Sequence, residues 1–314
     1  MPDSPYFRLA GLLLLVLLSC QSSEKKKLVS SAPLLNQQVT DDLGRAVSLN
    51  AQPEKVVSLA PNLTEIIFAI GAEDKLVARS QACDFPEETA DYPEVITYPE
   101  LDLEQIVATE ADLLVANDEI FTPERISQME RTGIPVYIQR YRTLDDVYQG
   151  IRKLGDLLDV TAGAQHIADS LQQLETRITE ETKDQVKYNT MVLISSNPLL
   201  VVGGQGYIHE IIEKAGGKNL FGDIDKPYHE TTVEEILKRQ PEFLILPSTD
   251  DQAYQNLLAL YPPLYNTPAD INKQVHLIRP DILYRPGPRM LDGLLQMTQI
   301  LHTQLTPDQF VSRP

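Results

Sequence analysis

Residues 161–183 read TAGAQHIADSLQQLETRITEETK, and the organisation of the whole chain depends on this stretch. Its apolar side chains recur at steps of three and four residues, the spacing that places them on one face of an amphipathic helix. That face consists of Ala164, Ile167, Ala168, Leu171, Leu174 and Ile178. No proline interrupts the run, so at 1.5 Å per residue the helix would be roughly 34 Å long. Thr161 is expected to cap its start by accepting hydrogen bonds from the first turn.

A helix of this length has two interpretations. It can bridge two domains, or it can lie on the surface of a single domain, and its periodicity alone slightly favours the surface position. Because no glycine follows Gly163 in the run, a continuous helix here would resist large hinge motion. The sequence on either side decides between the two interpretations.

Two pairs of segments on opposite sides of this helix align without gaps. Residues 104–116 (EQIVATEADLLVA) match residues 234–246 (EEILKRQPEFLIL), and residues 65–71 (EIIFAIG) match residues 210–216 (EIIEKAG). Each matched segment has the pattern of a helix, and the longer pair continues into a strand. A chance alignment of short helix–strand units is the alternative. A true repeat would make the long helix a bridge between two similar halves.

The predicted architecture is α/β, with two lobes of similar build. A period above 100 residues is too long for a solenoid, and 314 residues leave room for two domains with their own cores. We expect an N-terminal lobe at residues 38–160, the connecting helix at 161–183 and a C-terminal lobe at 184–314. Two such lobes would leave a cleft between them, which is the usual place for a ligand.

Composition excludes some classes of partner. Lys and Arg total 27 against 45 Asp and Glu, which gives a formal net charge of −18. Such a surface repels nucleic acid and anionic lipid. No nucleic-acid partner is therefore expected.

The N-terminus has the pattern of an export signal. The apolar run at residues 9–18 follows Arg8 and is too short to span a bilayer, but it has the length of a signal-peptide core. The run ends in Leu-Leu-Ser-Cys20, which resembles the bacterial lipobox, in which the cysteine is lipidated. We therefore expect a lipoprotein signal peptide at residues 1–20 and a flexible tether at 21–37. An ordinary cleaved signal with an incidental cysteine is the alternative.

Signatures of catalysis are mostly missing. The chain has no P-loop, no HExxH, no GxSxG and no CxxC motif. The histidines are scattered at positions 166, 209, 229, 276 and 302, so a bare metal site is not expected. Cys83 is left without an intramolecular partner once Cys20 is lipidated, and we interpret it as a small semi-buried thiol. Ligand binding without covalent chemistry is favoured over an enzyme or chelatase, or a surface adhesion module.

Aromatic and charged residues beside prolines are the candidate binding groups. Tyr98, Tyr228 and Tyr284 are expected in loops, where a tyrosine can stack on a flat ring or offer its hydroxyl, although ordinary packing is the alternative for each. Asp281 and Arg285 are expected at the end of a strand, on a loop with two prolines. Arg285 has the fork geometry for a ligand carboxylate or phosphate. A structural ion pair between Arg285 and Asp281 is the equally weighted alternative.

A set of motifs resembles a known family. These are residues 39–45 (VTDDLGR), 57–65 (VSLAPNLTE), 84–86 (DFP), 103–106 (LEQI), 215–219 (AGGKN), Glu234 and 285–289 (RPGPR). Together they resemble the helical-backbone (class III, cluster A) substrate-binding proteins of ABC importers, which bind vitamin B12, haem or ferric siderophores. The resemblance runs from about residue 38 to about residue 304. It implies two Rossmann-like α/β lobes joined by one long rigid α-helix, with the ligand cleft between the lobes.

Within this family, the motifs resemble those of the vitamin B12-binding members most. The resemblance places their two docking glutamates, one per lobe, on Glu104 and Glu234, which start the longer repeat pair. In those proteins the glutamates meet arginines of a dimeric permease that works with ATPase subunits, and two-fold related acids suit such a dimer. Acids favoured by the dipole at a helix N-terminus are the alternative.

The ligand site carries over in part. Tyr98 and Tyr228 take positions where the B12 binders place tryptophans, and Asp281 and Arg285 match a polar pair there. Aromatic positions of those proteins are instead occupied by Ala82, Asn117 and Ile194, and the chain has no tryptophan. The resemblance implies that the chain delivers a corrinoid to a permease, and the N-terminal pattern predicts an exported, membrane-anchored lipoprotein of the periplasm or cell surface. Haem, with Tyr98, Tyr228 or His229 as iron ligand, and a ferric siderophore stay open as ligands.

Overall fold

The computed structural model describes residues 37–310. The predicted signal peptide, Cys20 and all of the tether except its last residue lie outside the described residues. The described residues all belong to one compact unit. No helix within residues 37–310 is both long and apolar enough to cross a membrane.

The N-terminal half is built on a five-stranded sheet in which every neighbouring pair is parallel. The strand order is β5-β4-β3-β6-β7. The strands are β3 (Val56–Ser58), β4 (Leu76–Ser80), β5 (Glu94–Val95), β6 (Leu113–Asn117) and β7 (Val136–Gln139). The helices are α1 (Pro61–Ala69), α2 (Leu103–Ala108), α3 (Pro123–Glu130) and α4 (Leu144–Leu157), with 3-10 turns η1 (Glu73–Lys75) and η2 (Glu87–Asp91). A hairpin of β1 (Gln37–Thr40) and β2 (Ala46–Leu49) precedes this sheet.

The C-terminal half is built on a six-stranded mixed sheet. Its order is β11-β9-β8-β12-β13, and β10 also pairs with β8. The strands are β8 (Tyr188–Ser196), β9 (Leu199–Val202), β10 (Gly217–Asn219), β11 (Tyr228–Glu230), β12 (Phe243–Pro247) and β13 (Val275–Ile278). The helices are α6 (Tyr207–Lys214), α7 (Val233–Arg239), α8 (Ala253–Leu260), α9 (Pro268–Ile271), α10 (Asp281–Tyr284) and α11 (Met290–Leu301), with η3 (Pro262–Asn266) and η4 (Pro307–Gln309).

The segments that align in sequence form equivalent elements. Residues 104–116 form α2 and β6, and residues 234–246 form α7 and β12. Each helix starts from a side-chain cap, Asp102 for α2 and Thr232 for α7, which accepts from the backbone amide three residues on. Both β6 and β12 lie in the middle of their sheets, with parallel neighbours on each side. The halves differ beyond these elements, because β9 and β11 are antiparallel to their neighbours.

The long helix α5 runs from Thr161 to Thr182. Val160 holds the cap position and makes no side-chain cap, so the prediction that Thr161 caps the helix is wrong. Thr161 instead lies inside the first turn, and its hydroxyl donates to the Asp156 carboxylate at 2.8 Å. The chain turns directly from α4 into α5 through Asp159, which has a φ of 58°. Because of this tight turn, Thr161 is already helical and cannot hold the extended conformation of a capping residue.

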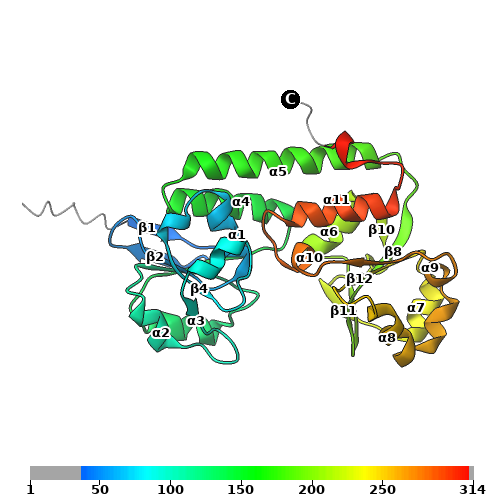
Figure 1. Cartoon of the computed structure of the whole chain (residues 1–314), viewed down its shortest axis with the longest axis horizontal. Coiled ribbons are helices and arrows are strands. Elements are labelled where there is room, and N and C mark those ends of the chain that lie inside the picture. Colours follow the sequence, from blue (N-terminus) through cyan, green and yellow to red (C-terminus); the bar gives the residue numbers. More distant parts are fainter. Residues whose placement is uncertain (1–36, 311–314) are drawn as a thin grey trace, which may run out of the picture. The chain divides into compact units, whose positions relative to one another are not determined.

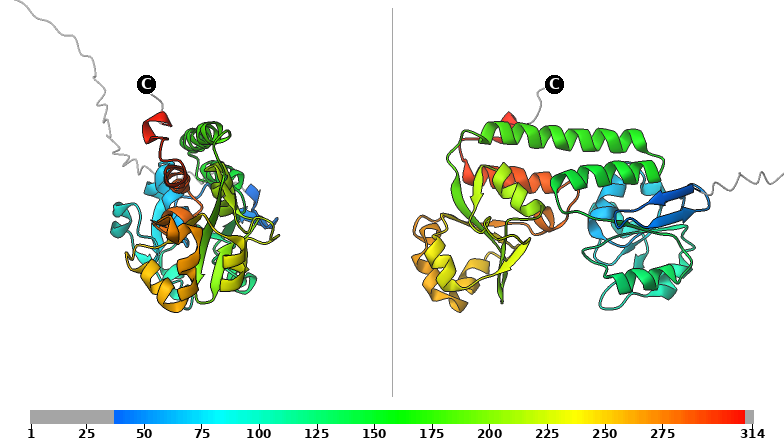
Figure 2. Two further views of the ribbon diagram at one scale, coloured as in Figure 1. Left: turned by 90° about the vertical axis from the view of Figure 1, so that its right-hand side faces the viewer. Right: turned by 180° about the vertical axis from the view of Figure 1, so that it is seen from behind.

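Helix α5 contacts both halves of the molecule. It packs on α4 and α1 of the N-terminal half and on α6 and α11 of the C-terminal half, and it runs alongside α4 and α11 in both ribbon views (Figures 1 and 2). Small residues bring it close: a Cβ on Gly163 would lie 2.5 Å from the Ile70 carbonyl oxygen at the end of α1. The predicted α/β fold with a long joining helix is confirmed.

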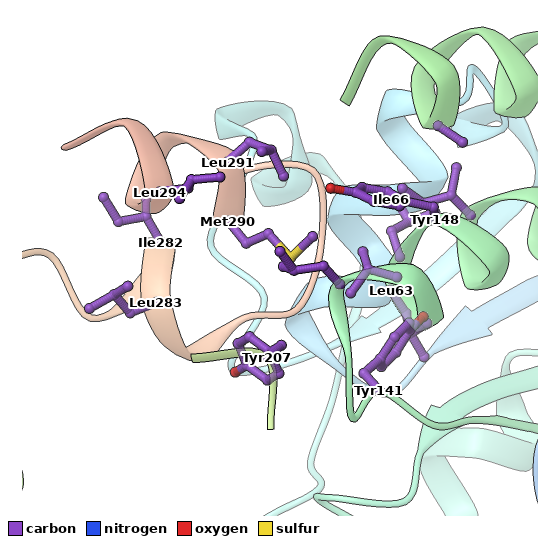
Figure 3. Close-up of a cluster of buried hydrophobic side chains, with 14 of the residues drawn as sticks. Leu63, Ile66, Tyr141, Tyr148, Tyr207, Ile282, Leu283, Met290, Leu291 and Leu294 are labelled. Atoms are coloured by element: carbon purple, nitrogen blue, oxygen red, sulfur yellow. The ribbon is translucent and has the colours of Figure 1, made fainter. Parts of the chain in front are cut away.

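One hydrophobic cluster runs through the junction of the two halves. It contains Leu63 and Ile66 of α1 together with Leu283 of α10 and Met290 of α11, all fully buried. Figure 3 shows Met290 between the α1 side chains and those of α10 and α11. Apolar surface buried between elements of both halves stabilises their junction.

Replacing Gly163 with alanine is expected to destabilise the fold by about 1–3 kcal/mol despite the higher helix propensity of alanine. The added methyl group would meet the Ile70 carbonyl, a backbone atom that cannot turn away as a side chain can. Chemical denaturation measures the free energy of unfolding. Ser170→Ala, on the exposed face of the same helix, is the control and should change stability by less than about 0.5 kcal/mol. Equal stability of the two variants would contradict the close approach of α5 to α1.

Candidate ligand-binding site

Two of the cavities that are lined by residues of both halves are candidates for the ligand site. The first has a volume of about 400 Å³ and is lined by Glu119, Tyr141, Arg142, Gln205, Gly206, Tyr207, Ile208, Pro227 and Tyr228. The second, of about 470 Å³, is lined by Asp84, Thr249, Arg279, Pro280, Asp281, Tyr284 and Arg285. Each is large enough to hold part of a sizeable organic ligand.

Tyr228 presents an aromatic ring to the first cavity. It is the first residue of β11 rather than a loop residue as predicted, and pairing of β11 with β9 sets it opposite Val202. Its side chain is half-exposed, with 41% of its surface accessible. Burial raises the pKa of the Tyr228 hydroxyl, and the nearby Glu119 carboxylate adds to the effect. The hydroxyl therefore stays protonated near neutral pH and can donate a hydrogen bond.

Three tyrosines with raised pKa values line the two cavities. Burial raises the pKa of Tyr207, and the electrostatic influence of Tyr228, Glu119 and Tyr284 raises it further. Tyr228 likewise adds to the effect of burial in raising the pKa of Tyr284. Groups that influence one another in this way lie close in space. Tyr207 and Tyr228 line the first cavity and Tyr284 lines the second.

An acid and a base from the N-terminal half face Tyr228. Arg142 contacts Glu119 at 3.3 Å and Asp118 at 2.6 Å. Burial raises the pKa of Glu119, and the Arg142 guanidinium counteracts part of that rise. Together these two side chains offer a donor and an acceptor to a ligand. Sequence reasoning missed both, because neither belongs to a recognisable motif.

Asp281 and Arg285 line the second cavity but do not pair with each other. Asp281 starts the short helix α10, whereas a loop was predicted, because the chain turns at Pro280 after β13 ends. The Asp281 carboxylate binds Arg279 at 3.0 Å and also binds Arg289. The alternative of a structural Asp281–Arg285 ion pair is therefore wrong. Tyr284 likewise lies at the end of α10 rather than in a loop.

Glu65 of α1 forms ion pairs with both Arg285 and Arg289. Its side chain is only 2% exposed, and it accepts from Arg289 at 2.9 and 2.6 Å and from Arg285 at 3.2 Å. Arg285 also binds Asp84 of the N-terminal half. These contacts join the two halves beside the second cavity. Glu65 lies within one of the matched sequence motifs, but no local pattern predicts its partners, which are more than 200 residues away along the chain.

Tyr98 lies in a loop, as predicted, and lines neither cavity. Its side chain is 76% exposed, and its carbonyl accepts from the Gln81 side chain at 3.1 Å. The structure therefore does not bring Tyr98 and Tyr228 into one cavity.

Glu104 and Glu234 hold equivalent places in the two halves. Each is the second residue of its helix, α2 or α7, and each is exposed. In the part of the chain that the structure describes, neither carboxylate has an ion-pair partner. Both are available to a partner protein, and both also lie where a helix dipole favours an acid.

Metal-binding side chains do not converge in the described region. No three His, Cys, Asp or Glu residues among residues 37–310 gather closely enough to hold a metal ion. Cys83 is fully buried beside Thr64 and Ser80, deeper than the predicted semi-buried position, and burial raises the pKa of its thiol.

Comparison with known proteins agrees with this architecture. A vitamin B12-binding protein of Vibrio parahaemolyticus is 28% identical over 250 residues, which cover 80% of this chain and 90% of that protein. The solved structure of the periplasmic vitamin B12 binding protein of Vibrio cholerae is 26% identical, with a TM-score of 0.70 over 80% of this chain and 98% of that one. A periplasmic heme binding protein from Pseudomonas aeruginosa gives a TM-score of 0.72 at 25% identity, covering 83% and 96%.

These relatives are binding proteins rather than enzymes, and they confirm the resemblance found in the sequence motifs. The family model described as periplasmic binding protein matches residues 56–282, most of the length of the chain. The chain therefore belongs to the periplasmic binding protein family.

Proposed function

We propose that this chain is a lipid-anchored substrate-binding protein of an ABC importer, which captures a corrinoid in the cleft and delivers it to the permease. The cleft lined by Tyr228, Glu119 and Arg142 on one side and by Tyr284 and Arg285 on the other is the main support. Similarity to vitamin B12-binding proteins over 80% of the chain adds to it.

The lining of the cleft suits a flat macrocycle with polar substituents. The Tyr228 ring provides an apolar face for stacking. A corrin carries amide side chains, which need both donors and acceptors, and Arg142, Glu119 and Gln205 supply both. On the N-terminal side we propose Tyr98, whose side chain is 76% exposed and is therefore open to contact with a ligand. Haem or a ferric siderophore is the alternative cargo, supported by the likeness to a heme binding protein.

We propose that the anchor and the docking residues complete the transport function. A lipid on Cys20 would hold the protein at a membrane, which labelling of cells with an alkyne fatty acid would detect. Exposed acids at equivalent helix starts, Glu104 and Glu234, would meet basic residues on the two subunits of a permease. One acid per lobe fits a partner with two-fold symmetry.

The ligand assignment is tested by titrating the purified protein with cyanocobalamin, haemin and ferric siderophores, followed by visible absorption and calorimetry. Saturable one-to-one binding of cyanocobalamin with a Kd of roughly 1 μM or tighter is expected. Binding of haemin or a ferric siderophore in place of cyanocobalamin would move the assignment to iron import. A Kd no better than roughly 1 mM for every ligand would contradict the transport function.

Tyr228→Ala should weaken corrinoid binding by about 1–3 kcal/mol, because the variant loses the stacking ring. Tyr228→Phe, which keeps the ring, is the control and should lose less. Tyr98→Ala is expected to lose affinity in the same range if its ring contacts the ligand. If isothermal titration shows an unchanged Kd for a variant, that tyrosine does not bind the ligand and has an ordinary surface or packing role.

Reversing both docking charges, Glu104→Arg with Glu234→Arg, should abolish permease-dependent uptake and leave ligand affinity unchanged. Uptake of labelled cobalamin by cells and titration of the purified variant measure the two effects separately. Glu124→Arg is the matched control, because Glu124 is also an exposed acid at the second position of a helix, α3. A large loss of ligand affinity in the double variant would argue against a docking role.

A further inference from the structure

Arg285 and Arg289, at the junction of the halves, differ in how many of their guanidinium nitrogens bind protein carboxylates. All three guanidinium nitrogens of Arg289 donate to carboxylates, Nε and Nη2 to Glu65 and Nη1 to Asp281. The guanidinium also lies 3.9 Å from the centre of the Phe85 ring. Carboxylates of the protein therefore hold three of the five N–H donors of Arg289, one on each nitrogen, and its role is mainly structural.

Arg285 binds protein carboxylates through only one of its guanidinium nitrogens. Its Nη1 donates both to Glu65, at 3.2 Å, and to Asp84. Within residues 37–310, no protein group accepts from its Nε or Nη2. The side chain is 19% exposed and borders the cavity of about 470 Å³. A guanidinium with two free neighbouring nitrogens matches the two oxygens of a carboxylate or phosphate.

Of the two carboxylates that bind Arg285, that of Asp84 is held less firmly than that of Glu65. Its side chain is 71% exposed, whereas that of Glu65 is 2% exposed. Arg285 is its only ion-pair partner among the described residues, and this hydrogen bond holds the pKa of Asp84 below its ordinary value. An exposed ion pair contributes little to stability, so the Asp84 carboxylate can leave at small cost. Glu65 cannot leave without exposing a buried charge.

The charges of the side chains that line the second cavity balance while Asp84 is in place. Its lining holds two cations, Arg279 and Arg285, and two anions, Asp84 and Asp281. Behind them, Glu65 and Arg289 neutralise each other. If the Asp84 carboxylate moves away, the lining keeps one net positive charge, which suits one oxyanion.

We infer that Arg285 is an oxyanion subsite of the cleft, and that Asp84 is the internal counter-ion which an acidic group of the ligand displaces. This inference rests on the proposed function. The ligand class it names is a molecule with an exposed phosphodiester or carboxylate group. Because Asp84 and Arg285 belong to different halves, binding of the ligand breaks one direct contact between the halves.

The test compares ligands with and without the acidic group. Cyanocobalamin carries a phosphodiester, and dicyanocobinamide is the related corrinoid without it. Asp84→Asn should tighten binding of cyanocobalamin by about three- to tenfold, because the competing charge is gone, and should change binding of dicyanocobinamide by less than about twofold. Glu87→Gln is the matched control, since Glu87 is an exposed acid on the same segment that does not touch Arg285. It should change neither affinity.

Arg285→Gln provides the second measurement. It should remove most of the preference for cyanocobalamin over dicyanocobinamide. Unchanged or weaker cyanocobalamin binding by Asp84→Asn would overturn the inference, and so would an equal gain for dicyanocobinamide. If the wild-type protein binds haemin instead, haemin and its dimethyl ester replace the two corrinoids with the same expected outcomes. Failure of the wild type to bind any of these ligands would overturn the proposed function, whereas a normal wild type without the variant effects overturns this inference alone.

Discussion

The buried carboxylate of Glu65 is the interaction on which the junction of the two halves depends. A charge that is 2% exposed must be paired, and Glu65 finds both of its partners, Arg285 and Arg289, in the other half of the chain. Removing one member of such a buried group costs roughly 3–5 kcal/mol, because the remaining charge is left without compensation. The segment from Arg285 to Arg289 is therefore fixed against α1. This fixed segment sets where Asp281, Tyr284 and Arg285 face the cleft.

The buried apolar cluster at the junction and helix α5 also hold the two halves together, as this ion-pair group does. Buried side chains of α1, α10 and α11 form one cluster, and α5 packs on elements of both halves. A dense shared core has discrete packing arrangements rather than continuous freedom, so large rotation of one half against the other would break many contacts at once. We therefore propose that the ligand cleft is preformed. Under the proposed function, ligand release needs small shifts imposed from outside, and Glu104 and Glu234 lie on the exposed surface where a permease could impose them.

Local sequence patterns predicted the long helix and the helix–strand units of the aligned pairs. Helix periodicity and the aligned pairs gave α2, β6, α7, β12 and α5 close to their observed bounds. The short link at Asn197-Pro198 between β8 and β9 requires a hairpin, because a parallel connection needs a dozen residues or more. The partners of Arg285 and the separation of Tyr98 from Tyr228 follow from long-range folding. No local pattern records that Glu65 lies beside a residue 220 positions away.

The acidity of the protein and the proposed anionic group of its ligand are compatible because the two act at different distances. A net charge of −18 repels an approaching anion, but at physiological salt this field is screened beyond about 8 Å. Inside the cleft, the free nitrogens of Arg285 act at contact distance in a partly buried setting, where a charge-assisted hydrogen bond is stronger than in water. Electrostatic steering therefore contributes little to the association rate of such a ligand. The contacts that form after entry set its residence time, and so the affinity is decided by dissociation.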